Sequence, residues 1–186
     1  VDVGELISQE IDMVEPVARK RGIEVTYTRP DQPVEIEAPP HALQSIITNL
    51  LMNAIKYNRE NGTVSVTLHA GGQDLRISVR DQGAGIAERD RPHVFLPLYR
   101  SRGAKQTIEG SGLGLTLVQR LVEGLGGRVW FDSVEGEGTT FFVDLPLIAD
   151  LTQDPQEAAD GVHDHLQEGA DHYALSKDRD QSPAKT

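Results

Sequence analysis

The sequence predicts an α/β domain, because helical and strand periodicities alternate along it. Residues 41–58 place apolar side chains at helical spacing. Residues 63–70 and 75–81 alternate apolar and polar side chains on either side of a Gly-Gly turn, as the strands of a hairpin do. The chain has 186 residues, 38% of them hydrophobic, and is therefore long enough to bury a core of its own.

The composition excludes several classes of site. The chain has no cysteine, which rules out disulfides, thiolate metal sites and cysteine nucleophiles. Its formal net charge of −11 argues against binding of nucleic acid, because such a surface repels a polyanion. No apolar stretch reaches the roughly 20 residues of a membrane span, and the first residues lack a signal-peptide pattern. We therefore expect a segment without membrane contact, cut from a longer protein because it starts inside an amphipathic pattern.

The helix predicted over residues 41–58 is the central element. Two prolines suit its start, and an Asn-Gly pair marks a turn beyond its end. Its apolar arc consists of Leu43, Ile46, Ile47, Leu50, Leu51 and Ala54. Asn49, Asn53 and Lys56 lie on the border of this arc. Two amide oxygens and an ammonium so arranged could hold a hydrated metal ion and contact a phosphate. A solvated polar face is the plainer interpretation of this helix taken alone.

The same periodicities predict the remaining elements. Further helices are expected at residues 3–20 and 115–125, and further strands at 23–28, 34–37, 128–133 and 139–145. From residue 149 the chain is polar, acidic and poor in β-branched and aromatic residues, which predicts a mostly disordered tail with a weak helix near its middle. His163 and His165 in this tail could bind a metal adventitiously, but a solvated tail is the simpler interpretation.

Two glycine-rich segments suggest a ligand. Asp81 ends a predicted strand, and Gly83 and Gly85 after it let the backbone approach a flat ligand that the carboxylate can hydrogen-bond. A plain turn is the alternative. Residues 93–115 carry basic side chains and then alternating glycines before a helix, which predicts a mobile segment whose end presents bare N–H groups to phosphate. The spacing does not fit the dinucleotide-binding fingerprint, and a plain loop explains it as well.

Taken together, these segments resemble a known family. The motifs, in order, are NLLMNAIKYN, DQGAGI, VFLPLYR and GSGLGL, followed by LVEGLGGRVWFDSVEGEGTTFFVDLPL. In this order and at these intervals they resemble the catalytic ATP-binding domain of bacterial sensor histidine kinases. That domain shares a superfamily with gyrase-type topoisomerases, MutL and the ninety-kilodalton heat-shock chaperone. The resemblance covers residues 23–147, makes residues 1–22 the end of a dimerisation hairpin and linker helix, and leaves 148–186 as an acidic tail.

The resemblance implies a fold and a set of ligands. The fold is a two-layer α/β sandwich, in which helices cover one face of a mixed, largely antiparallel sheet and a flexible lid closes over ATP. Asn53 matches the amide that coordinates Mg²⁺, and Asn49 faces the same site one turn earlier. Lys56 matches a phosphate contact, Tyr57 its neighbour beside the nucleotide, and Asp81 the carboxylate that accepts from the adenine amino group.

The remaining implied residues belong to the glycine motifs and the lid. Gly83, Gly85 and Ile86 would lie along the nucleotide. Arg100 matches a lid arginine near the γ-phosphate, and would complete the catalytic set of Asn49, Asn53 and Lys56. The second glycine box at the helix start consists of Gly110, Gly112, Leu113, Gly114 and Leu115.

The resemblance implies a kinase. Asn49 stands where the superfamily ATPases carry a water-activating glutamate, and a neutral amide cannot act as a general base. None of the six histidines lies in a phosphoacceptor context, so the acceptor is expected in an upstream dimerisation domain. The implied partners are that domain and the receiver domain of a response regulator, within a homodimeric kinase whose catalytic part is cytoplasmic, with or without a membrane anchor. Two alternatives stay open: a superfamily ATPase or anti-sigma-type kinase, and a degenerate nucleotide-binding scaffold.

Overall fold

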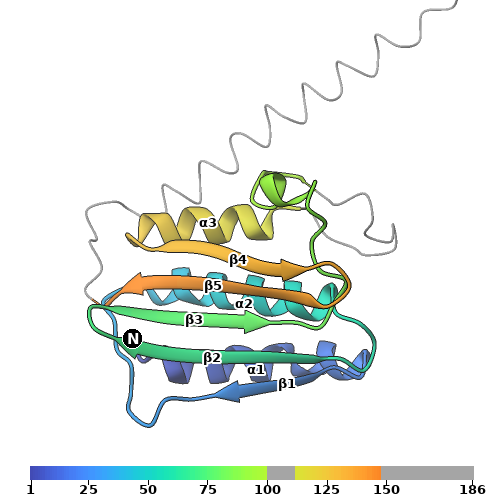
Figure 1. Cartoon of the computed structure of the whole chain (residues 1–186). Helices are drawn as coiled ribbons and strands as arrows, with labels where there is room; N and C mark the ends of the chain where they lie inside the picture. The colour runs from blue at the N-terminus through green and yellow to red at the C-terminus, as the bar shows by residue number, and fades with distance from the viewer. Residues whose placement is uncertain (100–111, 148–186) are drawn as a thin grey trace, which may run out of the picture.

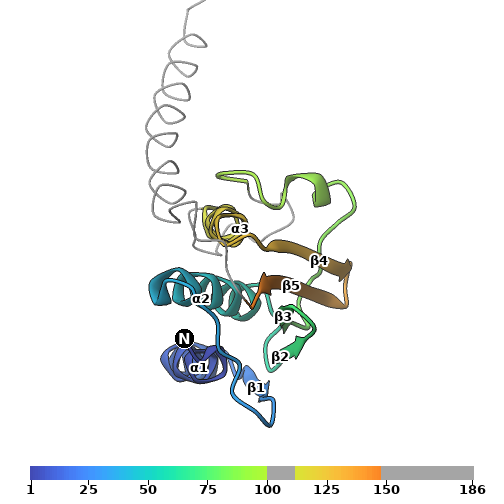
Figure 2. The same ribbon diagram turned by 90° about the vertical axis from the view of Figure 1, so that its left-hand side faces the viewer.

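Three helices cover one face of a five-stranded sheet in the computed structural model, which describes residues 1–99 and 112–147 (Figures 1 and 2). The described elements are α1 (Val3–Lys20), β1 (Glu24–Thr28), α2 (Pro40–Lys56), β2 (Thr63–Gly71), β3 (Asp74–Arg80), the 3₁₀ turn η1 (Arg91–His93), α3 (Gly114–Gly124), β4 (Arg128–Val134) and β5 (Gly138–Pro146). Arg100, Gly110 and the tail 148–186 lie outside the described residues.

The sheet is mixed and largely antiparallel. Its strand order is β1-β2-β3-β5-β4, so the last strand lies between β3 and β4 (Figure 1). The pair β1 and β2 is parallel, and the other three neighbouring pairs are antiparallel. The predicted two-layer arrangement, with helices on one face of such a sheet, is confirmed.

Helix α2 lies between α1 and α3 in the helical layer (Figure 2). All six side chains of its predicted apolar arc are at most 3% exposed. They pack against inward-facing strand residues such as Leu68, Ile77 and Val143, which are paired across neighbouring strands. Each buried leucine or isoleucine contributes about 1.5–3 kcal/mol of hydrophobic free energy, so this packing fixes α2 on the sheet.

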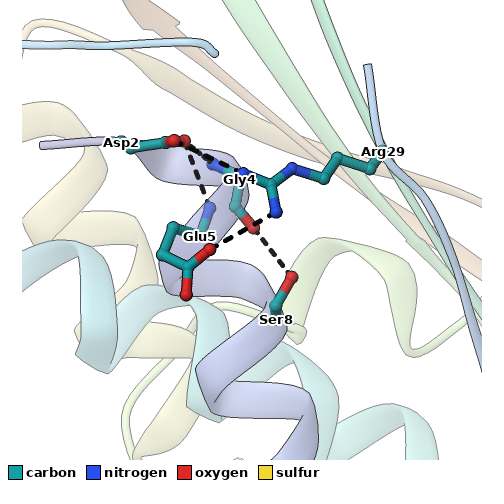
Figure 3. A network of polar contacts seen from close by, with 5 residues as sticks. All are labelled: Asp2, Gly4, Glu5, Ser8 and Arg29. Atoms are coloured by element: carbon teal, nitrogen blue, oxygen red, sulfur yellow. Dashed lines mark hydrogen bonds and ion pairs between the residues drawn. The ribbon is translucent and has the colours of Figure 1, made fainter. Parts of the chain in front are cut away.

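Helix α1 begins at a side-chain cap. Asp2 Oδ1 accepts hydrogen bonds from the backbone nitrogens of Gly4 at 2.8 Å and Glu5 at 3.1 Å, and Arg29 pairs with both acidic side chains (Figure 3). The buried hydrophobic residues of α1 belong to the same core as those of α2; they are Val3, Leu6, Ile7, Val14 and Ala18. The assignment of residues 1–22 to a dimerisation hairpin stays a prediction.

The strand predicted at residues 34–37 is wrong. This segment forms one isolated bridge, between Asp2 and Glu35. Flanking hydrogen bonds join Val34 to Val3 and, in both directions, Ile36 to Val1. Its partner is the short stretch before α1, and the start of the helix at Val3 ends the pairing. The alternating pattern therefore marked a half-buried extended segment outside the sheet.

The helix ends agree with prediction to within two residues. Helix α2 ends at Lys56, and the Asn58 side chain just beyond it hydrogen-bonds the backbone of Arg59 and Thr63. Within residues 1–99 and 112–147, no helix combines the length and apolar character that crossing a membrane requires.

The sheet face away from the helices carries a charged row. Arg76, Asp144 and Arg128 are directly paired across β3, β5 and β4. Asp144 accepts hydrogen bonds from both guanidinium groups, at 2.6 and 2.8 Å from Arg76 and at 2.8 and 3.1 Å from Arg128. Both guanidinium groups also lie over the ring of Trp130, with centroid distances of 4.9 and 4.7 Å. The hydrogen bond from Arg76 is the main cause that lowers the pKa of Asp144.

This row predicts a pH dependence of stability. A carboxyl group whose pKa is lower in the folded state than in the unfolded chain stabilises the fold above about pH 4, and this contribution is lost as pH falls through the folded pKa. We expect the free energy of unfolding to decrease below about pH 4 in urea titrations. Asp144→Asn should flatten that decrease, whereas Asp132→Asn, an exposed carboxylate on β4, should not. An unchanged slope in Asp144→Asn would contradict the assignment.

Candidate functional site

The predicted motifs meet where α2 ends and where the loop after β3 and the start of α3 approach it. A Cβ atom on Gly83 would lie 2.0 Å from the carbonyl oxygen of Tyr57, so the loop after β3 touches the end of α2. A Cβ atom on Gly114 would lie 2.6 Å from Asn49 Oδ1, so the first residue of α3 touches the polar edge of α2. The end of α2, the loop after β3 and the start of α3, which are distant in the sequence, therefore meet at one site.

Asp81 is the most buried charged group of this site. It follows β3 directly and is 5% exposed. Its Oδ1 accepts hydrogen bonds from the backbone nitrogens of Gly83 at 2.8 Å and Thr139 at 3.2 Å. No hydrogen bond within the described part of the chain engages Oδ2. Burial raises the pKa of Asp81, and the two backbone hydrogen bonds oppose this effect. The structure thus holds a desolvated carboxylate in one orientation, with one oxygen left for a ligand.

The two glycines after Asp81 are required for different reasons. Gly83 has no room for a side chain, because the carbonyl of Tyr57 occupies the space. Gly85 has φ +68°, and a Cβ atom there would lie 2.2 Å from the carbonyl oxygen of Val134. A larger residue would therefore need a strained backbone as well as a displaced turn.

Residues of the β4–β5 turn support this loop and were not predicted from the sequence. Ser133 Oγ accepts from the backbone nitrogen of Ile86 at 2.8 Å. The backbone nitrogen of Gly136 donates to the carbonyl of Ala84 at 2.7 Å. Thr139 both donates to and accepts from Asp81 through its backbone. The turn therefore determines where the loop lies, and the only signal in the sequence was its Glu-Gly-Glu-Gly turn between two strands.

Asn58 is a second residue that sequence reasoning missed. It is 6% exposed, and its Nδ2 donates to the carbonyl of Thr63 at 3.1 Å. Its Oδ1 accepts from the backbone nitrogens of Arg59 at 3.0 Å and Gln82 at 3.3 Å. One amide thus joins the end of α2, the start of β2 and the residue after Asp81. The available signal in the sequence was an asparagine at the predicted end of the helix, before a turn.

The polar edge of α2 supplies amides and an ammonium. Asn49 Nδ2 donates to the carbonyl of Ser45 at 2.7 Å, and its oxygen faces Gly114. Asn53 is half-buried one turn later. Lys56 Nζ lies 5.1 Å from the ring centroid of Tyr57. The described residues contain no cluster of histidine, cysteine, aspartate or glutamate that could hold a metal ion. The side-chain oxygens that Asn49 and Asn53 supply on this edge are neutral amide oxygens. Such oxygens suit Mg²⁺ that arrives with phosphate and keeps part of its water shell.

Helix α3 opens beside these amides without a side-chain cap. Leu113 occupies the N-cap position, and its apolar side chain leaves the backbone N–H groups of the first turn uncapped. Gly112 has φ +75°, a conformation that favours glycine, and its carbonyl accepts from Leu98 at 3.1 Å. The positive end of the α3 dipole therefore lies at Gly114, against Asn49, while Leu115 is half-buried on the core. This end is a suitable place for a phosphate group.

A hollow elsewhere in the described structure is distant from these residues. It has a volume of about 170 Å³ and is lined by Asp74, Gly126, Gly127, Arg128, Asp144 and Pro146. Asp74 is the first residue of β3, so this hollow lies at the opposite end of the strand from Asp81. It contains none of the predicted site residues.

Comparison with known proteins identifies the family. Residues 38–149, more than half of the chain, match the family described as histidine kinase-, DNA gyrase B-, and HSP90-like ATPase. The chain belongs to this family. It is 37% identical over 157 residues to the sensor histidine kinase ZraS of Escherichia coli K12, covering 84% of this chain and 32% of that protein. It is 32% identical over 161 residues to the sensor histidine kinase WalK of Bacillus subtilis, covering 85% of this chain and 26% of that protein.

Solved structures of histidine kinases share the fold of this ATPase-family domain. The mycobacterial sensor histidine kinase MprB superposes with a TM-score of 0.69 at 30% identity, covering 80% of this chain and 98% of that structure. Full-length ShkA in complex with AMPPNP superposes with a TM-score of 0.65 at 30% identity, covering 83% of this chain and 32% of that structure. The predicted family is thus confirmed. The chain spans about a third of the length of the curated relatives, and the roles of the site residues stay predictions.

Proposed function

We propose that this chain binds ATP with Mg²⁺ and supplies the γ-phosphate for a histidine in a dimerisation domain upstream of it. The geometry of Asp81 supports this proposal most directly. Two backbone N–H groups hold its Oδ1, and a glycine loop lies beside it. A carboxylate fixed in this way can accept a hydrogen bond from the exocyclic amino group of adenine through Oδ2.

The phosphate end of the ligand would lie between α2 and α3. Lys56 and the first N–H groups of α3 would place positive charge beside the phosphates. Arg100, which lies outside the described residues, would add a further positive charge. Asn53 and Asn49 would hold Mg²⁺, which supplies neutralisation of phosphate charge. Gly112, Leu113, Gly114 and Leu115 form the described part of the second glycine box, and Gly110 would extend it.

Phosphoryl transfer by this site would rest on positioning. The bond between the γ-phosphorus and its bridging oxygen would break, ADP would leave, and an N–P bond would form to the acceptor imidazole, which would release its N–H proton to solvent. Asn49 is neutral and cannot deprotonate water, so the side chain at this position disfavours hydrolysis. We therefore propose the imidazole of the upstream domain as the nucleophile, within a homodimeric, cytoplasmic kinase that passes the phosphoryl group to a response regulator.

Calorimetric titration with ADP and a non-hydrolysable ATP analogue, with and without Mg²⁺, tests the binding step. We expect micromolar to sub-millimolar affinity that depends on Mg²⁺. Adding a separately produced dimerisation domain and radiolabelled ATP tests transfer. Steady hydrolysis without any acceptor would favour a superfamily ATPase, and binding without transfer would favour a degenerate scaffold. Absence of binding under all conditions would overturn the proposal.

Asn53→Ala should separate metal binding from nucleotide binding. We expect the affinity for ADP to fall about tenfold in the presence of Mg²⁺ and to stay within about twofold in EDTA, because only the metal ligand is lost. Gln73→Ala, an exposed amide in the β2–β3 turn, is the matched control. Equal losses with and without Mg²⁺ would argue against a metal role for Asn53.

A further inference from the structure

The direction of α2 creates an electrostatic problem at the proposed phosphate site. The helix runs from Pro40 to Lys56, so its C-terminal end lies at Lys56 and Tyr57. A helix C-terminus carries unsatisfied carbonyl groups and about half a negative charge. An anionic ligand beside this end is repelled unless a cation compensates the carbonyls.

Arg21, at the end of α1, contacts these carbonyls directly. Its guanidinium Nη1 donates to the carbonyl oxygens of Ile55 and of Lys56, the latter at 2.7 Å. Its Nη2 donates to the carbonyl oxygen of Asn58 at 3.1 Å. One half-buried side chain therefore satisfies three carbonyls in the last turn of α2 and beyond it. This is a cation in the favourable position for a helix C-terminus, supplied by another helix.

The backbone around Arg21 holds it against the chain that follows α2. The carbonyl of Arg21 accepts from the backbone nitrogen of Asn61 at 3.2 Å. Gly22 has φ +66°, and a Cβ atom there would lie 2.2 Å from Asn61 Oδ1. The end of α1 is thus packed on the turn after α2, and the guanidinium has little freedom to move away from the carbonyls.

We infer that Arg21 is a positioning residue for phosphate binding. Its charge offsets the C-terminal carbonyls of α2, and its hydrogen bonds fix the turn that presents Lys56 and Tyr57. The same turn touches the loop of Asp81, because the carbonyl of Tyr57 lies against Gly83. This inference rests on the proposed function, since it concerns the phosphates of the same nucleotide.

The inference predicts an effect that grows with ligand charge. Removal of the guanidinium exposes the negative end of α2 to the phosphates but not to an uncharged nucleoside. A purely structural role would instead weaken all ligands equally, because a displaced turn disturbs the whole site.

The test compares adenosine with ADP in the presence of Mg²⁺, measured by protein-observed nuclear magnetic resonance, which tolerates weak ligands. For Arg21→Met we expect about a tenfold loss in ADP affinity and less than about a twofold loss for adenosine. Arg21→Lys, which keeps the charge, should retain most of the ADP affinity. Arg19→Met is the matched control, because Arg19 has the same charge at the same helix end but pairs with Glu15 on the surface.

A further variant, Arg21→Gln, separates the charge of Arg21 from its role in folding. If thermal unfolding shows that Arg21→Met is not folded, Arg21→Gln replaces it, because glutamine keeps hydrogen-bond donors but has no charge. We expect Arg21→Gln to show the same selective loss of ADP affinity. Equal losses for adenosine and ADP, or unchanged ADP affinity, would overturn the inference while leaving the proposed function intact. Absence of ADP binding by the unmodified chain would instead overturn the proposed function, and this inference with it.

Discussion

Asp81→Asn is expected to weaken the binding of ADP by about 1.5–3 kcal/mol, or one to two orders of magnitude. The substitution removes an ionised acceptor and can turn an amide donor toward the amino group of adenine. The two backbone hydrogen bonds from Gly83 and Thr139 can still be accepted by the amide oxygen, so the loop should keep its conformation. Calorimetric titration of both proteins with ADP measures the difference.

The stability of Asp81→Asn without ligand gives an independent readout. Burial raises the pKa of Asp81 in the fold, because the charged carboxylate is disfavoured there. The fold is therefore stabilised while Asp81 is protonated, and this contribution to the free energy of unfolding is lost as pH rises through the folded pKa. A neutral amide has no such loss. We therefore expect the ligand-free variant to be at least as stable as the parent protein at pH 7 in urea unfolding.

Asp74→Asn is the matched control, because Asp74 lies at the opposite end of the same strand. It should leave ADP affinity unchanged. Unchanged affinity in Asp81→Asn would remove Asp81 from the adenine role.

Gly83→Ala is expected to destabilise the fold by about 2–3 kcal/mol and to weaken ADP binding at least tenfold. The new methyl group would lie 2.0 Å from the carbonyl oxygen of Tyr57 and 2.8 Å from its carbonyl carbon. Both are backbone atoms, so a side-chain rotation cannot relieve the clash. Either the loop after β3 or the end of α2 has to move, and both carry proposed ligand contacts. Urea unfolding and calorimetric titration measure the two effects.

Gly71→Ala is the control for this substitution. A Cβ atom on Gly71 would approach only the His69 ring, at 3.3 Å, and that side chain can move. We expect less than about 1 kcal/mol of destabilisation and unchanged binding. If Gly83→Ala behaved like Gly71→Ala, the close contact between the loop and α2 would be wrong.

Features that depend on neighbouring positions in the sequence were predictable. The apolar arc of α2 follows from a repeat within a single helix, and every member of that arc is buried. The carboxylate and glycines after β3 form one short run, so their proximity required no knowledge of the fold. The family resemblance added the two-layer arrangement, with helices on one face of a mixed, largely antiparallel sheet, and the structure confirms it.

Features that depend on strand pairing were not predictable. Thr139 hydrogen-bonds Asp81 because β5 inserts beside β3, and no local pattern brings together residues that far apart. The side chains of Arg21 and Asn58 hydrogen-bond backbone groups of segments distant in the sequence. Such contacts do not depend on the side chains of those segments, so the sequence pattern does not reveal them. The segment 34–37 was wrongly predicted as a strand of the sheet. Alternation of apolar and polar residues predicts an extended chain but not the segment with which it pairs.

The place of β5 in the sheet has a consequence for synthesis. During translation, β3 emerges with one edge unpaired, and β4 has no neighbour until the last strand is released and inserts between them. Both hydrogen bonds between the Thr139 backbone and Asp81, one to its backbone nitrogen and one to its carboxylate, require that insertion. The Asp81 carboxylate thus gains its second backbone donor only when β5 has been synthesised. We therefore expect a nascent chain that stops short of β5 to bind the proposed ligand poorly and to expose an unpaired strand edge.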